Sequence, residues 1–125
     1  RAASSNSLDL IRLIAPTTDE KRIKNICTDA SGYIYYISVK GVTGSNKIDP
    51  VEVESKVDTI QSMTDLPVVV GFGIKDADSV ISVRDLSDGI VVGSALVNLI
   101  AEGKNQLSDK ISNKIEELSS ALLSE

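Results

Sequence analysis

Short apolar runs alternate along the chain with longer segments in which apolar residues recur every three or four positions. The apolar runs fall at residues 8–14, 33–39, 66–74 and 89–92. Runs this short are typical of strands in a parallel sheet, whereas the longer periodic segments are typical of amphipathic helices. The pattern therefore predicts the order βαβαβαβα, with a parallel sheet and right-handed crossovers.

Capping residues and apolar stripes mark the expected helices. Thr17 or Thr18 is expected to cap the first main helix, and Asp49 and Asp76 are expected to cap the next two. Helical spacing then predicts which side chains face the core: Ile23, Ile26, Cys27 and Ala30; Val53, Val57 and Ile60; Ala77, Val80 and Ile81; and Leu107, Ile111, Ile115, Leu118 and Leu122.

Glycines follow the last two apolar runs. The third run ends in Gly71, Phe72 and Gly73, and the fourth ends in Gly93 and Ser94, where a short apolar helix begins. Two such turns in succession suit an anion, most naturally a phosphate, held by backbone N–H groups. We expect the amides of Gly73, Gly93 and Ser94 to sit at helix starts and to bind the anion without a cationic side chain. The alternative is that these glycines only make tight turns between strand and helix. A further glycine-bearing loop, residues 41–48, follows the second run, at the strand end where parallel α/β proteins bind ligands.

Two closures of the sheet fit the alternating pattern: an open doubly wound sheet, or four consecutive units of an eight-unit barrel. Barrel enzymes often hold phosphate with the loops after strands seven and eight and a short extra helix. The glycine turns and the short helix from Ala95 follow that order. No G-x-G-x-x-G fingerprint opens a helix, so the barrel is the favoured interpretation.

Composition and charge narrow the functional classes. With 125 residues, we expect a single domain over 1–125, and 42% hydrophobic residues supply a core. A net charge of −5 disfavours a nucleic-acid partner, and no apolar run reaches the length of a membrane span. The chain has no histidine and one cysteine, Cys27, so we expect no zinc site and no histidine-based catalysis. Cys27 falls on a helical stripe, which favours a core role over a nucleophilic one. The lone cysteine is compatible with a reducing, cytoplasmic setting.

Several segments together resemble a known family. Residues 13–18, 33–38, 41–44, 71–74 and 93–97 resemble, in order and spacing, the tryptophan synthase alpha subunit. The resemblance runs from Leu8 to about Ile100 and matches only the second half of that family's barrel, strands five to eight. It implies an α/β fold that is the second half of a TIM (β/α)8 barrel, with four parallel βα units and a short helix at the phosphate site.

The resemblance implies a lyase that cleaves indole-3-glycerol phosphate to indole and glyceraldehyde 3-phosphate in tryptophan biosynthesis, without a cofactor or a metal. The implied partner is a tryptophan synthase beta subunit, and the implied location is the cytoplasm, or the plastid stroma in a plant. One departure is Val39, where family members usually carry a basic residue that follows the serine. The positions that the resemblance assigns to substrate binding are Tyr35, Thr43, Gly44, Gly71, Phe72, Gly73, Ile74, Val91, Gly93 and Ser94.

The general acid and base of that family are carboxylates of the first-half strands and loops, which would precede Arg1. We therefore expect no catalytic residue in this chain, and expect the chain alone to be inactive. Half of a barrel would also leave two strand edges open, which predicts self-association. The alternatives are another phosphate-binding barrel enzyme, such as a sugar phosphate isomerase, and a non-catalytic half-barrel that binds phosphate or a partner.

Overall fold

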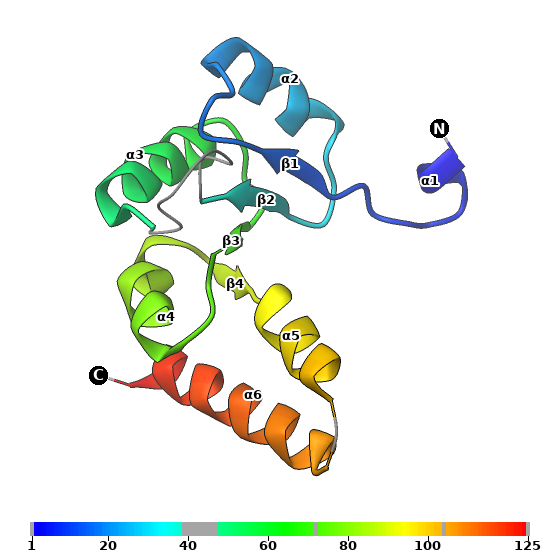
Figure 1. Ribbon diagram of the computed structural model, residues 1–125. Coiled ribbons are helices and arrows are strands. Elements are labelled where there is room, and N and C mark those ends of the chain that lie inside the picture. Colours follow the sequence, from blue (N-terminus) through cyan, green and yellow to red (C-terminus); the bar gives the residue numbers. More distant parts are fainter. Residues whose placement is uncertain (1, 39–47, 72, 104, 125) are drawn as a thin grey trace.

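The computed structural model describes residues 2–38, 48–71, 73–103 and 105–124. Within them, one sheet of four parallel strands runs in the order β1-β2-β3-β4 (Figure 1). The strands are β1 (Arg12–Ile14), β2 (Ile34–Ile37), β3 (Val68–Gly71) and β4 (Gly89–Val91). Each strand pairs with the next one in the chain, without the reversal of order that marks a doubly wound sheet. The strand order therefore agrees with the barrel interpretation.

Helices connect the strands and extend the chain beyond them. They are α1 (Ala2–Ser5), α2 (Glu20–Asp29), α3 (Pro50–Gln61), α4 (Ala77–Val83), the 3-10 turn η1 (Arg84–Leu86), α5 (Ser94–Glu102) and α6 (Leu107–Leu123). α1 stands apart from the sheet, whereas α6 runs beside α4 and α5 at the other end of the chain (Figure 1). Among these helices, none combines the length and the apolar character that crossing a bilayer requires.

The two faces of the sheet differ in burial. Ile14, Tyr36 and Val70 lie side by side in register, and each is fully buried with the core residues of α2, α3 and α4. Burial of each aliphatic side chain contributes about 1.5–3 kcal/mol to folding. The neighbouring row of side chains, from Leu13, Tyr35 and Val69, faces the opposite side of the sheet. Leu13, at the edge of this row, is 55% exposed. The described helices therefore cover one face, as on the outside of a barrel.

Aspartates cap three of the helices. The expectations for Asp49 and Asp76 are confirmed, because each side chain accepts a hydrogen bond from the first turn of its helix. The expectation for Thr17 or Thr18 is wrong, because the cap of α2 is Asp19, which accepts from Arg22 N at 2.8 Å. The Thr18 hydroxyl instead accepts a hydrogen bond from Ala15 N at 3.1 Å, in the turn that precedes the helix.

All four strands are shorter than the apolar runs that predicted them. Residues 8–11 are not strand, and β1 begins only at Arg12. Before it, Leu10 exchanges hydrogen bonds with Ser31, whose hydroxyl accepts from Leu10 N at 2.7 Å and whose N–H donates to Leu10 O at 3.0 Å. Leu8 and Leu10 are exposed, so their apolar character does not reflect burial in this sheet. In β2, Tyr33 precedes the first strand residue, Ile34.

The predicted helical stripes are partly corrected. Those of α2 and α3 are confirmed, including buried Cys27, although Ala30 follows the end of α2 and is only partly buried. In α4, Ile81 is 46% exposed and Val83 is buried instead, because this helix is short and ends against η1. In α6, Leu118 and Ala121 are the buried residues, since that face packs on α4. Ile115 and Leu122 are about half exposed, beside an apolar cavity of about 210 Å³ between α4, α5 and α6.

Candidate anion-binding site

A cavity of about 230 Å³ opens where β3 and β4 end, at the carboxyl edge of the sheet. It brings together six of the ten residues singled out from the sequence: Tyr35, Gly73, Ile74, Val91, Gly93 and Ser94. Tyr35 comes from β2, Val91 ends β4, and the other four follow the ends of β3 and β4. Thr43, Gly44 and Phe72 lie outside the described residues, as does Val39.

α5 is the helix that begins in this cavity, and its start differs from those of α2, α3 and α4. Its N-cap is Gly93, and no side chain accepts a hydrogen bond from its first turn. The first N–H groups of a helix lack partners within the helix and carry a partial positive charge. Without a carboxylate at the cap, this end of α5 is open to an external anion.

Gly71, also singled out from the sequence, does not line the cavity but lies against Tyr35, which does. A side chain there would clash with the Tyr35 ring, so glycine makes room for Tyr35 against β3. The Gly71 carbonyl accepts hydrogen bonds from the Ser38 N–H at 3.0 Å and from the Ser38 hydroxyl at 2.9 Å. Ser38, which the sequence did not single out, therefore joins the carboxyl ends of β2 and β3.

The cavity can bind polar and flat apolar groups, but its described lining includes no carboxylate. Burial, and secondarily the neighbouring Tyr33, raises the pKa of the Tyr35 hydroxyl, so it remains a hydrogen-bond donor at neutral pH. Asp88 lies at the opposite edge, where its carboxylate accepts a hydrogen bond from Val68 N at 2.9 Å. Within the described ranges, no group of three or more histidine, cysteine or acidic residues could hold a metal ion.

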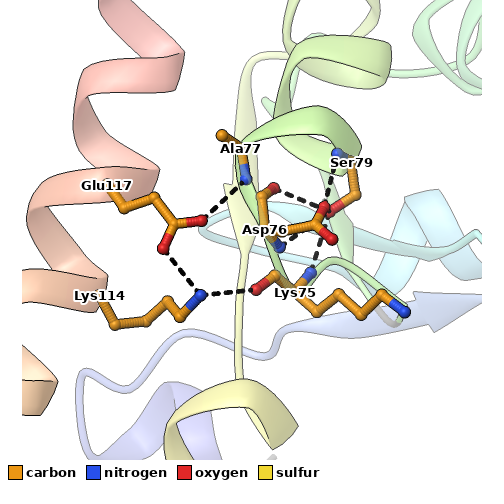
Figure 2. Close-up of polar contacts among 6 residues, drawn as sticks. All are labelled: Lys75, Asp76, Ala77, Ser79, Lys114 and Glu117. Carbon is orange, nitrogen blue, oxygen red and sulfur yellow. Dashed lines mark hydrogen bonds and ion pairs between the residues drawn. The ribbon is translucent and has the colours of Figure 1, made fainter.

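The segment after β3 forms one wall of the cavity. Gly73 has φ of +83°, a conformation that other residues rarely adopt, and Ile74 is buried. We expected the Gly73 amide to sit at a helix start, which is wrong, because α4 begins only at Ala77. Lys75 is exposed, and its N–H donates to the Ser79 hydroxyl at 3.0 Å (Figure 2).

A second cavity, of about 410 Å³, lies at the amino edge of the sheet and includes residues that precede β1 and β2. Leu8, Leu10, Asp29 and Ser31 contribute to it, together with α1. It is larger than the first, but it has an acidic residue and no strand-to-helix glycine in its lining. The smaller cavity therefore fits an anion better.

The comparisons with known proteins identify the family and the fold of the chain. The sequence profile of the tryptophan synthase alpha chain matches residues 1–123. This chain belongs to the tryptophan synthase alpha chain family. The tryptophan synthase alpha chain of Thioalkalivibrio sulfidiphilus is 55% identical over 98 residues, which are 78% of this chain and 37% of that relative. The one from Marinobacter nauticus is 49% identical over 111 residues, covering 89% of this chain and 41% of the relative.

Solved structures of the tryptophan synthase alpha family give the same result. The tryptophan synthase alpha subunit of Campylobacter jejuni is 34% identical, with a TM-score of 0.78 over 93% of this chain and 46% of that one. A Mycobacterium tuberculosis tryptophan synthase structure is 28% identical, with a TM-score of 0.83 over 99% of this chain and 46% of that one. The four strands and their helices therefore match part of the TIM barrel of tryptophan synthase alpha. The chain spans less than half the length of these relatives.

Proposed function

We propose that this chain forms the phosphate- and indole-binding part of a lyase that cleaves indole-3-glycerol phosphate to indole and glyceraldehyde 3-phosphate in tryptophan biosynthesis. One observation carries the proposal: the helix that starts in the cavity, α5, is the one with a glycine cap in place of an aspartate. Membership of the tryptophan synthase alpha chain family supplies the reaction.

In this proposal, the N–H groups at Gly73, Gly93 and Ser94 bind the phosphate without a cationic side chain. The α5 dipole contributes about 0.3–1 kcal/mol to holding an anion, and up to about 2 kcal/mol in a partly buried site. Tyr35 and Val91 lie in the same cavity and supply apolar surface for the indole ring. In this proposal, the Tyr35 hydroxyl donates a hydrogen bond to the bound substrate.

The first prediction tests the phosphate site at Gly93. We expect Gly93→Asp to weaken the binding of glycerol 3-phosphate at least tenfold, because the new carboxylate would occupy the place of the anion and repel it, a loss of about 1.4 kcal/mol or more. Isothermal titration calorimetry of glycerol 3-phosphate into each variant measures the effect.

Gly93→Ala is the matched control. A Cβ at Gly93 would meet no atom within 4 Å, so alanine should bind with nearly native affinity. Lys75→Ala should also change the affinity little, because Lys75 is exposed. A larger loss for Lys75→Ala than for Gly93→Asp would show that a side-chain cation, not the backbone, holds the phosphate.

The second prediction concerns catalysis. We expect the 125-residue chain alone to release no indole from indole-3-glycerol phosphate, because the described cavity lining offers no carboxylate to protonate the ring or to take the hydroxyl proton. Addition of a separately expressed amino-terminal half from a relative such as the Marinobacter nauticus protein should restore turnover. Indole release by the chain alone, followed spectrophotometrically, would contradict this expectation. A tryptophan synthase beta subunit is the proposed partner of the completed barrel.

A further inference from the structure

We propose that Lys114 and Glu117, on the C-terminal helix α6, position the Gly73–Ile74 wall of the anion-binding cavity. This inference rests on the proposed function in one respect, the use of glycerol 3-phosphate as a probe. Neither residue lines that cavity, and both act through the backbone of the segment between β3 and α4.

The contacts bracket Asp76 from both sides (Figure 2). One carboxylate oxygen of Glu117 accepts a hydrogen bond from Ala77 N at 3.2 Å. The other oxygen pairs with Lys114 Nζ at 2.8 Å, and the same ammonium donates to Lys75 O at 3.3 Å. α6 therefore holds the chain immediately before and immediately after the α4 cap.

Hydrogen bonds within the segment also link Lys75, Asp76 and Ser79 to one another. The Ser79 hydroxyl accepts hydrogen bonds from Lys75 N at 3.0 Å and from Asp76 N at 3.1 Å. The Asp76 carboxylate accepts from Ser79 N at 2.9 Å, which completes a capping box. Because residues 75–79 are tied to one another, a shift of α6 at Glu117 would carry Lys75 with it, and Ile74 and Gly73 follow directly in the chain.

Neither Gly73 nor Ile74, the two residues of the wall, carries a polar side chain. Gly73 lines both the anion-binding cavity and another cavity, of about 320 Å³, to which Asp76 and Ser79 also contribute. At Gly73, which has no side chain, only backbone atoms border the two cavities. The buried Ile74 anchors the wall in the core, and the contacts of Lys75 O and Ala77 N to α6 hold the chain that follows it.

Of the two residues, Glu117 gives the more discriminating test, because losing its charge and losing its contact have opposite expected effects on anion binding. Loss of a negative charge should tighten the binding of an anion if Coulomb repulsion is the only link between the sites. Loss of the contact to Ala77 should instead weaken it, because the wall is no longer held. Coulomb's law alone and the positioning role thus predict opposite signs for Glu117→Ala.

The experiment is calorimetric titration of glycerol 3-phosphate into matched pairs of variants. We expect Glu117→Ala and Lys114→Ala each to weaken binding about fivefold, at the low end of typical couplings between sites. Glu116→Ala and Lys110→Ala are the controls, because they remove the same charges from exposed positions of the same helix and should leave the affinity near native. Lys114→Arg, which keeps the charge and the donors, should restore it.

A comparison with a generally destabilised protein separates positioning from loss of stability. Ile60→Val, on the buried face of α3, should lower the free energy of unfolding by about 0.5–1.5 kcal/mol and leave the affinity unchanged. Unchanged or tighter binding by Glu117→Ala, relative to Glu116→Ala, would overturn the inference. So would an Ile60→Val variant that loses as much affinity as Glu117→Ala.

Amide NMR of the ligand-free chain tests the inference independently of the proposed function. We expect Glu117→Ala to speed hydrogen exchange at Ala77 and to shift the amide resonances of Gly73 and Ile74, while Glu116→Ala does neither. If the native chain fails to bind glycerol 3-phosphate but these resonances shift, the proposed function fails and the positioning role stands. If they do not shift, the positioning role fails whatever the native chain binds.

Discussion

Two adjacent tyrosines of β2 show that a shift of one position along a strand changes the environment of a side chain. Tyr35 faces the cavity, whereas Tyr36 is fully buried on the face that the helices cover. The Tyr36 hydroxyl has no hydrogen-bond partner among the described residues. Burial, with a smaller effect of Glu52, raises the pKa of Tyr36 to about 12. A buried hydroxyl without a partner costs free energy.

The third prediction follows from this hydroxyl. Tyr36→Phe should raise the free energy of unfolding by about 1 kcal/mol, because it removes the desolvated oxygen and keeps the ring. The Tyr36 pKa rises from 10.0 to about 12 on folding, so the native protein should lose stability between pH 10 and 12. Tyr36→Phe should flatten that slope, and urea unfolding at several pH values measures both effects. Tyr35→Phe is the control at a partly exposed neighbour, and a loss above about 1 kcal/mol in Tyr36→Phe would reveal a partner for the hydroxyl.

Sequence reasoning at this scale succeeded where one residue type answers one backbone need. Asp49 and Asp76 were recognisable as caps, and the glycines of the cavity were recognisable from the strands that they end. It failed at Asp19, because Thr17 and Thr18 are also good caps, and the sequence does not reveal that the Thr18 hydroxyl accepts a hydrogen bond from Ala15 N in the preceding turn. Ser38 and Glu117 were missed because their partners, Gly71 O and Ala77 N, are distant in sequence.

Among the elements, α4 depends most on its polar start. It has seven residues, too few to form a helix alone, and its first turn is held by Asp76, Ser79 and Glu117. Hydrogen bonds from Ser79 lower the pKa of Asp76 below its usual value of 3.8, and the hydrogen bond from Lys114 lowers that of Glu117 below 4.5. α4 is therefore an element whose stability depends on ionised carboxylates.

The fourth prediction concerns this acid dependence. Because both folded pKa values are depressed, these carboxylates stabilise the native state above their unfolded pKa values and stop doing so as the pH falls through the folded ones. Asp76→Ala should cost about 1 kcal/mol at pH 7 and much less at pH 2 to 3. Urea unfolding across that range measures the difference. Asp78→Ala, an exposed acidic neighbour in the same turn, should show a smaller effect, and equal effects of the two would refute the role of the cap.

Periodicity alone could not predict which face of α4 and α6 is buried. Ile81 and Ile115 sit on apolar stripes but are about half exposed. The helices α4 and α6 pack on each other, and their buried residues Val83, Leu118 and Ala121 belong to the common core. The order of strands and helices, in contrast, was predictable, because runs of valine and isoleucine between helical segments have few alternatives.

At the scale of the molecule, the sheet has two free edges within the described part of the chain, β1 and β4. One of its faces is covered by α2, α3 and α4, and the other carries half-exposed side chains such as Leu13. An open parallel edge beside an apolar face favours pairing with another chain.

The fifth prediction is that the isolated chain self-associates at micromolar concentration. Leu13→Lys should shift it toward monomer, because the charge would be placed at the edge of β1. Val51→Lys is the control, on the exposed surface of α3, and should not change the association. Sedimentation velocity measures the three proteins. A strictly monomeric native chain, or equal behaviour of the two variants, would rule out pairing through this edge.

The stepwise order of the strands also bears on how the chain gains and loses structure. Each pairing of neighbouring strands closes a loop that contains only the helical connection between them. The entropic cost of loop closure is therefore divided over three moderate steps, and no pairing closes a loop of the whole chain. β1 and β4 share no hydrogen bonds, since two strands lie between them. The α4–α6 end can therefore keep its contacts while β1 and α2 detach, and partial unfolding should proceed one βα unit at a time.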